Sequence, residues 1–417
     1  MSAGRTAAPS RDGVPVTLRL LPHALVASMG YVLFAVAALP DLLSARLGIG
    51  PAAFGLLTSA PLGAFALVQP LASRLSDRRP TTGVLLGAAV VHVVLAVALD
   101  LAEGFATLLT LRFVWGLVAG LVLSVGATHI ARLRRDSAST LEQGVFGGML
   151  TLGGAAAFLS AGPVVAATGG LGLHAVGIVP GVVALACGVG NRGDRRTGPR
   201  SSAGGQVPDA SSASTENPGG RSAQETLATV TNPTVLAAGL AYVAVIGSYV
   251  TLSTFITSYL GALGVLGPVN ALVLVGATAG RVSGGVAGWR LPGSDTAFVV
   301  VSVAAAAAGF AALATGPGGR LLVALPFATM VALSVPFGAL FDLAAGATDA
   351  EGLALAAVVA AGNVAALVLP PVAGAIREAT GGYAGVFAVL ALLNGVAAVG
   401  AVALAGGRYA DRGTVNS

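Results

Sequence analysis

The sequence predicts an all-α membrane protein with twelve transmembrane helices in two pseudo-symmetric six-helix bundles. First, only 9% of its 417 residues are charged and 55% are hydrophobic, whereas a soluble domain, which faces water on every side, carries about 25% charged residues. Second, twelve apolar stretches each hold the roughly 20 residues that cross a bilayer core. Third, one polar segment, residues 191–231, divides these stretches six and six.

The expected N-terminal bundle covers residues 20–190 and follows a cytoplasmic tail of residues 1–19. Each of its six windows is mostly apolar and at least 20 residues long, as a helix with a rise of about 1.5 Å per residue requires to span the hydrocarbon. In chain order, these windows are residues 20–40, 51–73, 82–101, 105–131, 143–167 and 170–190.

The segment 191–231 is rich in Ser, Gly, Pro and Arg, a composition typical of a flexible linker, here expected on the cytoplasmic side. The expected C-terminal bundle covers residues 232–406 and precedes a cytoplasmic tail of residues 407–417. Sixty glycines suit both bundles, because small residues let membrane helices approach closely. The second six windows are residues 232–260, 265–288, 296–315, 321–345, 353–376 and 383–406.

The distribution of Arg predicts the orientation, because cytoplasmic loops of membrane proteins carry an excess of basic residues. All 22 basic residues are Arg, and with both termini in the cytoplasm 18 of them, Arg281 included, fall on that side. Only Arg46, Arg320 and Arg377 fall outside, and Arg112 lies within a span. We therefore expect a multi-pass protein of the cell membrane. The net charge of +5 follows from this topology and does not indicate a nucleic-acid partner.

The two halves of the sequence resemble each other. In the fifth stretch Gly154 precedes Pro163 by nine residues, and in the eleventh Gly362 precedes Pro371 by the same interval. Repeated halves suit alternating access, in which one bundle rocks against the other around a site near the midplane. This layout favours a transporter over a receptor or a membrane enzyme.

A short motif follows the second stretch. Residues 73–80 resemble the loop signature G-x-L-(A/S)-D-R-x-G-R-R of the major facilitator superfamily, in which Leu75, Ser76, Asp77 and Arg78 match. The resemblance implies that Asp77 and Arg78 help to hold the two halves closed on the cytoplasmic side. A carboxylate there can lie at the N-terminus of a facing helix, such as the eleventh span. The alternative is an Arg cluster that only sets the topology.

Arg112 stands inside the fourth stretch. From Leu108 to Ala119 the sequence resembles the superfamily motif l-x-x-x-R-x-x-q-G-x-g-a, with Gly116 matching and Trp115 in place of Gln. The resemblance implies that Arg112 takes part in proton coupling or holds an anionic group. A charge within a span costs at least about 2.5–3.5 kcal/mol, which also favours a functional role. The alternative is that its side chain extends to the outer surface.

Gly162 and Pro163 resemble the core of the superfamily's antiporter motif, G-P-x-x-G-G, with Ala166 and Ala167 in place of the two glycines. Because Pro kinks a helix and small residues permit close contact, Gly154, Gly162 and Pro163 are expected to form a helix-packing motif. We expect the same of Gly362 and Pro371. The motif favours export, although simple helix packing explains it nearly as well.

Polar side chains that could face a transport pathway are few. Those that we expect to line a pocket are Tyr31, His92, Tyr242, Tyr249, Ser253, Thr257 and Asn363. Four of them, from Tyr242 to Thr257, recur at helical spacing in the seventh stretch. Each taken singly is more often an interhelical hydrogen bond than a ligand contact. No carboxylate lies in the middle of a span.

We therefore predict a monomeric secondary transporter of a small solute, and we favour proton-coupled export of drug-like or apolar compounds. The alternative is an uptake carrier for a small anion such as nitrate, cyanate or a carboxylate, although a single Arg in the spans is fewer than such a site would use. No enzymatic activity and no cofactor are expected. The four His show no metal-ligand spacing, and the single cysteine, Cys187, excludes an internal disulfide.

Overall fold

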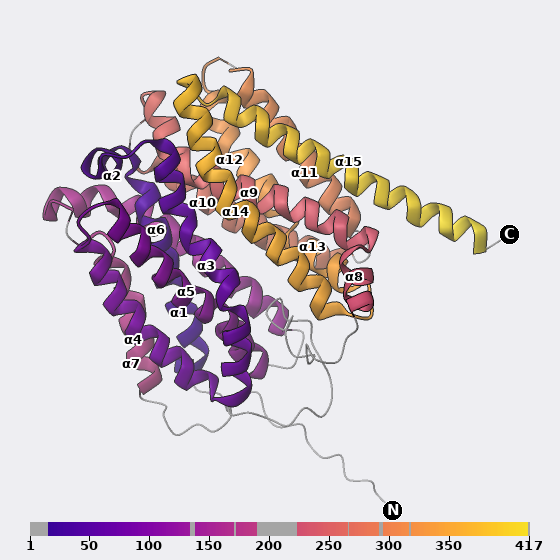
Figure 1. The fold of residues 1–417 in the computed structure, drawn as a ribbon, viewed down its shortest axis with the longest axis horizontal. Coiled ribbons are helices and arrows are strands. Elements are labelled where there is room, and N and C mark those ends of the chain that lie inside the picture. The colour runs from indigo at the N-terminus through magenta and orange to yellow at the C-terminus, as the bar shows by residue number, and fades with distance from the viewer. Residues whose placement is uncertain are drawn as a thin grey trace, which may run out of the picture.

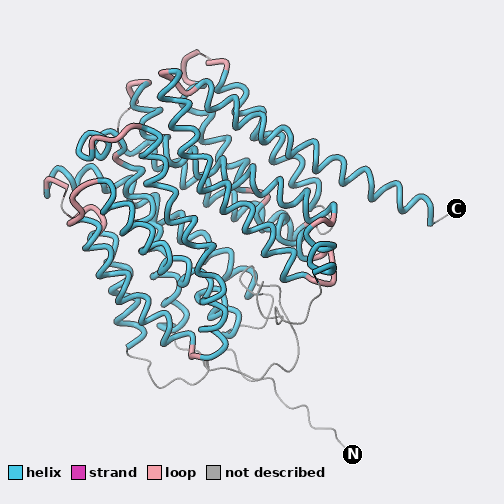
Figure 2. The backbone as a smooth tube through the Cα atoms, viewed as in Figure 1, coloured by secondary structure: helices cyan, strands magenta, loops and turns pink. Residues whose placement is uncertain are grey.

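The computed structural model describes residues 16–133, 138–170, 172–189, 223–265, 267–291, 295–316 and 318–415. These residues form helices joined by short loops, without a strand among them (Figure 2). The predicted all-α class is therefore correct. The helices fall into two groups that lie side by side, one built from the first half of the chain and one from the second (Figure 1).

The N-terminal group contains five long helices and one short one at the positions of the expected windows, together with α2, which the sequence did not predict. Their bounds are α1 Val16–Ala38, α2 Pro40–Leu47, α3 Pro51–Arg78, α4 Thr81–Asp100, α5 Phe105–Leu133, α6 Ala138–Thr168, the 3₁₀ helix η1 Ala175–Ile178 and α7 Val179–Val189.

The C-terminal group begins with a short helix, α8 Ala223–Val230, that lies within the expected linker. The end of that segment is thus helical, and residues 190–222 lie outside the described residues. The last helix continues into the expected C-terminal tail. The bounds are α9 Pro233–Ala262, η3 Pro268–Ala271, α10 Leu272–Arg290, α11 Asp295–Ala314, α12 Leu321–Ser334, α13 Phe337–Ala345, α14 Glu351–Thr380 and α15 Ala384–Val415.

Within the described residues, 11 helices are long and apolar enough to cross a membrane. The sixth expected span is represented by the shorter apolar helix Ala175–Ala186. We call the end of the molecule that carries α2 the α2 end, and the opposite end, where α3 stops at Arg78, the Asp77 end. The two bundles pack against each other mainly through α3 and α14 and through α6 and α10.

Glycines set how closely these helices approach. A Cβ at Gly30 of α1 would collide with the backbone of Leu150 in α6, and one at Gly153 would collide with the backbone of Ala27. α1 and α6 therefore pack backbone against backbone, as small residues permit in membranes. Between the bundles, a Cβ at Gly55 would collide with Pro370 in the same way.

The expected packing role of Gly162 is not found among the described contacts. A Cβ there would meet no atom within 4 Å, and both Gly162 and Pro163 are exposed on the surface of α6. Gly154, by contrast, leaves room for Phe34 of α1 and Leu274 of α10. Eight residues correspond to about 2.2 helical turns, which turns Gly162 away from the face that Gly154 presents.

The same geometry separates Gly362 from Pro371 in α14. A Cβ at Gly362 would collide with the Tyr242 ring of α9, whereas Pro370 and Pro371 lie against Gly55 of α3. Nine residues are two and a half helical turns, so the two ends of the motif face opposite neighbours. In α14 both ends therefore pack, one within the C-terminal bundle and one across to the N-terminal bundle.

Prolines inside spans leave carbonyl groups that their own helix does not satisfy, because Pro lacks the N–H that would bond to residue i−4. Pro22 frees the carbonyl of Leu18, and His129 Nε2 of α5 donates to it at 3.0 Å. Pro326 frees the carbonyl of Leu322, and the Tyr259 hydroxyl of α9 donates to it at 3.1 Å. These bonds tie neighbouring helices of one bundle together.

The packing analysis makes a prediction about two glycines of α6. Gly153→Val should lower the free energy of unfolding by about 1–3 kcal/mol or prevent folding, because the added methyl groups collide with α1. The matched change Gly162→Val, on the open face of the same helix, should be close to neutral. Thermal unfolding of the full chain in detergent measures both. Equal losses in the two variants would contradict the assignment of the packing face.

Candidate functional site

Arg112 is fully buried in the N-terminal bundle, and the backbone of two neighbouring helices surrounds its guanidinium. Nε donates to the carbonyl of Leu57 in α3 at 2.7 Å, and Nη2 donates to that of Leu33 in α1 at 3.0 Å. A longer bond, 3.5 Å, joins Nη1 to the carbonyl of Val32. No carboxylate pairs with Arg112 among the described residues. It therefore braces α1, α3 and α5 against one another.

The Leu57 carbonyl needs a donor because residue 61 is Pro61, which has no N–H to offer it. Gly116, one turn beyond Arg112, permits the contact: a Cβ there would lie 2.6 Å from Pro61 Cα. Arg112 and Gly116, two of the residues that match the superfamily motif, thus serve one junction, where α5 crosses α3 at its proline. The alternative, that the Arg112 side chain extends to the outer surface, does not hold, since no part of the side chain is exposed.

Trp115 and His92 form a second buried link. The indole N–H of Trp115 donates to His92 Nδ1 at 3.0 Å, so Nδ1 is an acceptor and Nε2 carries the proton. His92 Nε2 then donates to the Ser28 hydroxyl at 2.8 Å, and that hydroxyl donates to the carbonyl of Gly177. Both ring nitrogens of His92 are bonded within the bundle, and none is left for a ligand.

Tyr31 also points into the N-terminal bundle. Its hydroxyl lies 2.7 Å from the Ser160 hydroxyl of α6, and its ring lies so close to Gly177 that a Cβ there would collide with it. Tyr31 and the His92 chain therefore both contact Gly177 of η1, Tyr31 through its ring and His92 through Ser28. The bonds of Tyr31 and His92 together tie α1, α4, α6 and η1.

Sequence reasoning missed Asp100 and His174, which form a buried pair at the α2 end. The Asp100 carboxylate, at the end of α4, accepts from His174 Nδ1 at 2.8 Å and from the backbone N–H groups of His174 and Ala175. Burial lowers the pKa of His174 below its usual 6.5, which favours the neutral ring, although the adjacent Asp100 acts the other way. The residues are 74 apart, so no sequence spacing could indicate the pair.

In the C-terminal bundle the expected stripe of α9 is divided between different surroundings. Tyr242 is buried against the rings of Phe337 and Phe341, with centroids 5.9 and 5.4 Å away. Thr257 accepts a hydrogen bond of 2.9 Å from the Asn270 amide. The Ser253 hydroxyl is buried without a hydrogen-bond partner among the described residues, and Asn363 of α14 is half-buried.

Tyr249, from the same stripe, reaches the boundary between the bundles. Its ring meets Phe34 of α1 edge-on at 6.4 Å, and the Arg281 guanidinium lies 5.2 Å from its centroid. Arg281 also lies 4.4 Å from the Phe337 centroid, and its Nη1 donates to the carbonyl of Gly147 in α6 at 3.3 Å. We call Phe34, Tyr249, Arg281 and Phe337 the interface cluster.

The position of Arg281 corrects the count of Arg in the spans. It was expected on the cytoplasmic side, but it lies within the span Pro268–Gly288 and is half-buried between two rings. The sequence held a signal, because residue 281 falls inside the expected window 265–288. Among the described residues, Arg112 and Arg281 are therefore the two Arg that lie well inside their spans, one in each bundle, whereas the other Arg of the spans lie within four residues of a span end.

At the α2 end several bonds join the two bundles. Ser59 Oγ of α3 donates to the carbonyl of Leu367 in α14 at 3.0 Å, and Pro371 is the residue that frees this carbonyl. The Glu378 carboxylate accepts from the N–H of Ala52, in the first turn of α3, at 2.9 Å. A carboxylate is favoured at a helix N-terminus by the exposed N–H groups and the dipole. The α2 end is therefore closed between α3 and α14.

At the Asp77 end the motif residues lie at the close of α3. Asp77 is 48% exposed and pairs at 4.0 Å with Arg132 of α5, in its own bundle. Arg78 is exposed, Leu75 is half-buried and Ser76 is buried. The expected contact of Asp77 with the facing helix α14 is not among the contacts of the described residues.

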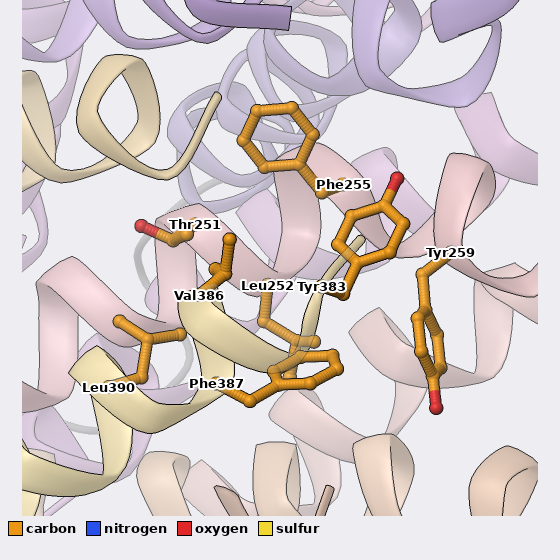
Figure 3. Close-up of a pocket in the computed structure, with 8 residues that line it drawn as sticks. All are labelled: Thr251, Leu252, Phe255, Tyr259, Tyr383, Val386, Phe387 and Leu390. Atoms are coloured by element: carbon orange, nitrogen blue, oxygen red, sulfur yellow. The ribbon is translucent and has the colours of Figure 1, made fainter. Parts of the chain in front are cut away.

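Figure 3 shows a small pocket in the C-terminal bundle between α9 and the start of α15. Aromatic and aliphatic side chains line almost all of it, including Phe255, Tyr383 and Phe387. Burial raises the pKa of Tyr383 to about 12, so its hydroxyl stays protonated at neutral pH. The space is a narrow gap between packed side chains, and it shares no lining residue with the interface cluster. The lining residues are Thr251, Leu252, Phe255, Tyr259, Tyr383, Val386, Phe387 and Leu390.

Comparison with known proteins identifies the family and the fold of this chain. Residues 20–351 match the Major Facilitator Superfamily. The chain belongs to this superfamily. A search of the curated proteins gives no match. Among solved structures, the chain is similar to a bacterial homolog of the human lysosomal transporter Spinster, in an inward-facing and occupied conformation, with a TM-score of 0.68. The alignment covers 92% of this chain and 95% of that one at 16% identity, so it supports the superfamily's fold and no more.

Membership makes the chain a multi-pass membrane protein and a secondary transporter. The described residues contain no group of three or more His, Cys, Asp or Glu that could hold a metal ion. Polar chemistry deep in the spans therefore rests on Arg112, Arg281, the buried His, and the hydroxyl and amide side chains. Of these, Arg112 and His92 are already bonded within their bundle, whereas the interface cluster is not fully bonded.

The junction of Arg112 with Pro61 yields a prediction. Arg112→Gln should lower the free energy of unfolding by about 1–3 kcal/mol, because the Leu57 carbonyl loses its donor in a buried site. In a Pro61→Ala background the N–H of residue 61 can bond to that carbonyl, so the same change should cost less. A double-mutant cycle by thermal unfolding measures the coupling. Additive losses would show that Arg112 does not act through the Leu57 carbonyl.

His174 yields a prediction about pH. Because its pKa is lowered in the folded chain, His174 binds a proton near pH 6.5 in the unfolded chain but only at lower pH in the folded chain. This contribution to stability is therefore complete above pH 6.5 and is lost as the pH falls below it. His174→Asn keeps a donor for Asp100 but cannot titrate, so its unfolding temperature should fall less than that of the wild type between pH 7.5 and 5. If the unfolding temperatures of the two proteins fell equally with pH, the assignment of this pH dependence to His174 would be wrong.

Proposed function

We propose that the chain moves a small organic solute across the cell membrane by alternating access, with the Asp77 end and both termini facing the cytoplasm. The superfamily supports secondary transport, and the excess of Arg near the Asp77 end supports the orientation. In this proposal each bundle moves as a rigid unit, because Arg112, His129 and Tyr259 tie neighbouring helices within a bundle through backbone carbonyls.

The observation that carries the proposal is the asymmetry between the two ends. Ser59 and Glu378 join α3 to α14 at the α2 end, while Asp77 pairs inside its own bundle at the other end. This arrangement is the one expected of a transporter that is closed to the outside between these two helices. Asp77 would then contact the second bundle only in the opposite conformation, where the signature motif closes the cytoplasmic side.

The solute that this interface suits has an apolar body. Phe34, Tyr249 and Phe337 offer ring surfaces at the boundary of the bundles, which favours aromatic or drug-like compounds. Exchange for protons is part of the proposal for export. Because both nitrogens of His92 are bonded, a proton-carrying role for His92 would require its bond with Trp115 to break. We also propose that the transporter works as a monomer.

Two substitutions should shift the conformational equilibrium in opposite directions. Ser59→Ala removes a cross-bundle bond at the α2 end and should favour the outward-open state about 2- to 10-fold, as the loss of one hydrogen bond predicts. Pro371→Ala should act alike, because the new N–H can bond to the Leu367 carbonyl, and combining the two should add little. Asp77→Asn should favour the inward-open state. Both shifts should slow transport without preventing insertion.

The measurement uses spin labels at Glu103→Cys and Thr315→Cys, in loops of the two bundles at the α2 end, in a Cys187→Ser background. Double electron–electron resonance should report a longer distance for Ser59→Ala and Pro371→Ala. The control is Thr58→Ala, which removes a bond of α3 to its own Phe54 carbonyl. Unchanged distances in Ser59→Ala would contradict the closed α2 end. Flux in proteoliposomes equal to that of empty liposomes for cationic, neutral and anionic compounds would contradict transport itself.

A further inference from the structure

Arg281 lies deep in its span. It is nine residues beyond Leu272, the first residue of α10, which corresponds to about 14 Å along the helix. Within the described residues no Asp or Glu pairs with it. An Arg at this depth costs several kcal/mol unless it faces protein, water or a counter-charge. An Arg in this position therefore indicates a functional site with a binding partner for the guanidinium.

The surroundings of Arg281 leave part of its hydrogen-bonding capacity unused. Its Nε is buried without a hydrogen-bond partner in the part of the chain that the structure describes, and so is the Tyr249 hydroxyl. Tyr249 is only 4% exposed. Within the described residues Arg281 makes one hydrogen bond, from Nη1 to the neutral carbonyl of Gly147, and this bond is long at 3.3 Å. Buried polar atoms without partners are rare in proteins and ask for an explanation.

We propose that the interface cluster binds the negatively charged group of the transported solute, and that this solute is a carboxylate with an aromatic or apolar body. This inference rests on the proposed transport function. A carboxylate matches the planar guanidinium of Arg281, to which it can bind through two parallel hydrogen bonds. The Tyr249 hydroxyl adds a third donor, and the rings of Phe34 and Phe337 receive the apolar body.

Arg112 does not compete for this role. Its three nitrogens all donate to backbone carbonyls inside the N-terminal bundle, so a ligand could reach them only by opening the junction with α3. Arg281, by contrast, stands where the two bundles meet and holds one long bond. The charge that the sequence motif singled out is therefore structural, and the charge available to a solute is in the other bundle.

Binding at Arg281 also affects the contact between the bundles. The bond to Gly147 joins α10 to α6, and one turn away the hydroxyls of Thr151 and Thr278 meet at 2.6 Å. A carboxylate pairs its negative charge with the guanidinium and can accept two parallel hydrogen bonds from it, whereas the neutral Gly147 carbonyl accepts one long bond, so the carboxylate displaces Gly147. The solute then removes one of the bonds that hold α6 to α10. Occupancy of the site and movement of the bundles are thereby linked.

The test compares acids with their uncharged amides on the purified full chain in detergent. The probes are benzoate and 2-naphthoate, each paired with benzamide or 2-naphthamide at equal concentration. We expect at least one acid, and neither amide, to raise the unfolding temperature of the wild type by about 2 °C or more at saturation, because a ligand that binds only the folded state stabilises it. Arg281→Gln should abolish the rise, and Arg281→Lys should weaken it at least tenfold in affinity.

The control variant is Arg377→Gln, which removes another Arg that lies over an aromatic ring, Tyr383, but at the α2 end. It should keep the full response to the acid. Tyr249→Phe, which removes only the hydroxyl, should weaken binding several-fold while leaving the preference for acid over amide. Equal responses to acids and amides, no response to either acid, or a response that persists in Arg281→Gln would each overturn the proposal.

The same experiment separates this inference from the proposed function. An acid that binds through Arg281 but is not carried into proteoliposomes by the wild type would support the site and contradict transport of that class. Transport of neutral or cationic compounds that is unaffected by Arg281→Gln would support the transporter and overturn the carboxylate site.

Discussion

The structure depends on how backbone carbonyls freed by prolines are satisfied inside the membrane-spanning helices. Lipid offers no hydrogen bonds, so a carbonyl that loses its N–H partner is stabilised if it finds a donor on another helix. Four freed carbonyls do so here, and each is paired with a donor of a different chemical type. The pairs are Leu18 with His129, Leu57 with Arg112, Leu322 with Tyr259, and Leu367 with Ser59.

Two of these pairs lie within the N-terminal bundle and one lies within the C-terminal bundle. The fourth joins the two bundles. The bonds made by His129, Arg112 and Tyr259 involve buried or aromatic side chains in packed surroundings, which suits helices that stay together. Ser59 makes a single neutral bond across the bundle boundary, which is weak enough to break and re-form. Alternating access requires this distinction, since rigid bundles must separate at one end while each keeps its own contacts. The same chemical device can therefore serve rigidity in one place and movement in another.

The two arginines deep in the spans, Arg112 and Arg281, show how the surroundings of a buried charge assign its role. Arg112 is surrounded by carbonyl dipoles that replace its hydration, and it needs no counter-ion to remain in place. Arg281 has aromatic faces, which attract a cation through their quadrupoles, but it has no comparable set of acceptors. A guanidinium stabilised mainly by rings keeps N–H groups for a further partner. That difference lies in the neighbours of each residue, several of which are far away in the sequence.

The sequence by itself determined the number and limits of most spans, because the cost of placing polar residues in lipid acts on each segment independently of its neighbours. It also indicated that Arg112 and Gly116 matter, since both belong to a recognisable motif. It did not determine their purpose, which depends on Pro61 in another helix. Nor could it predict that Asp100 meets His174, that Gly162 faces away from the packing surface, or that Arg281 stands between Tyr249 and Phe337. Only the tertiary structure decided these points, because they follow from which helix faces which neighbour, and that arrangement is set by contacts across long stretches of chain.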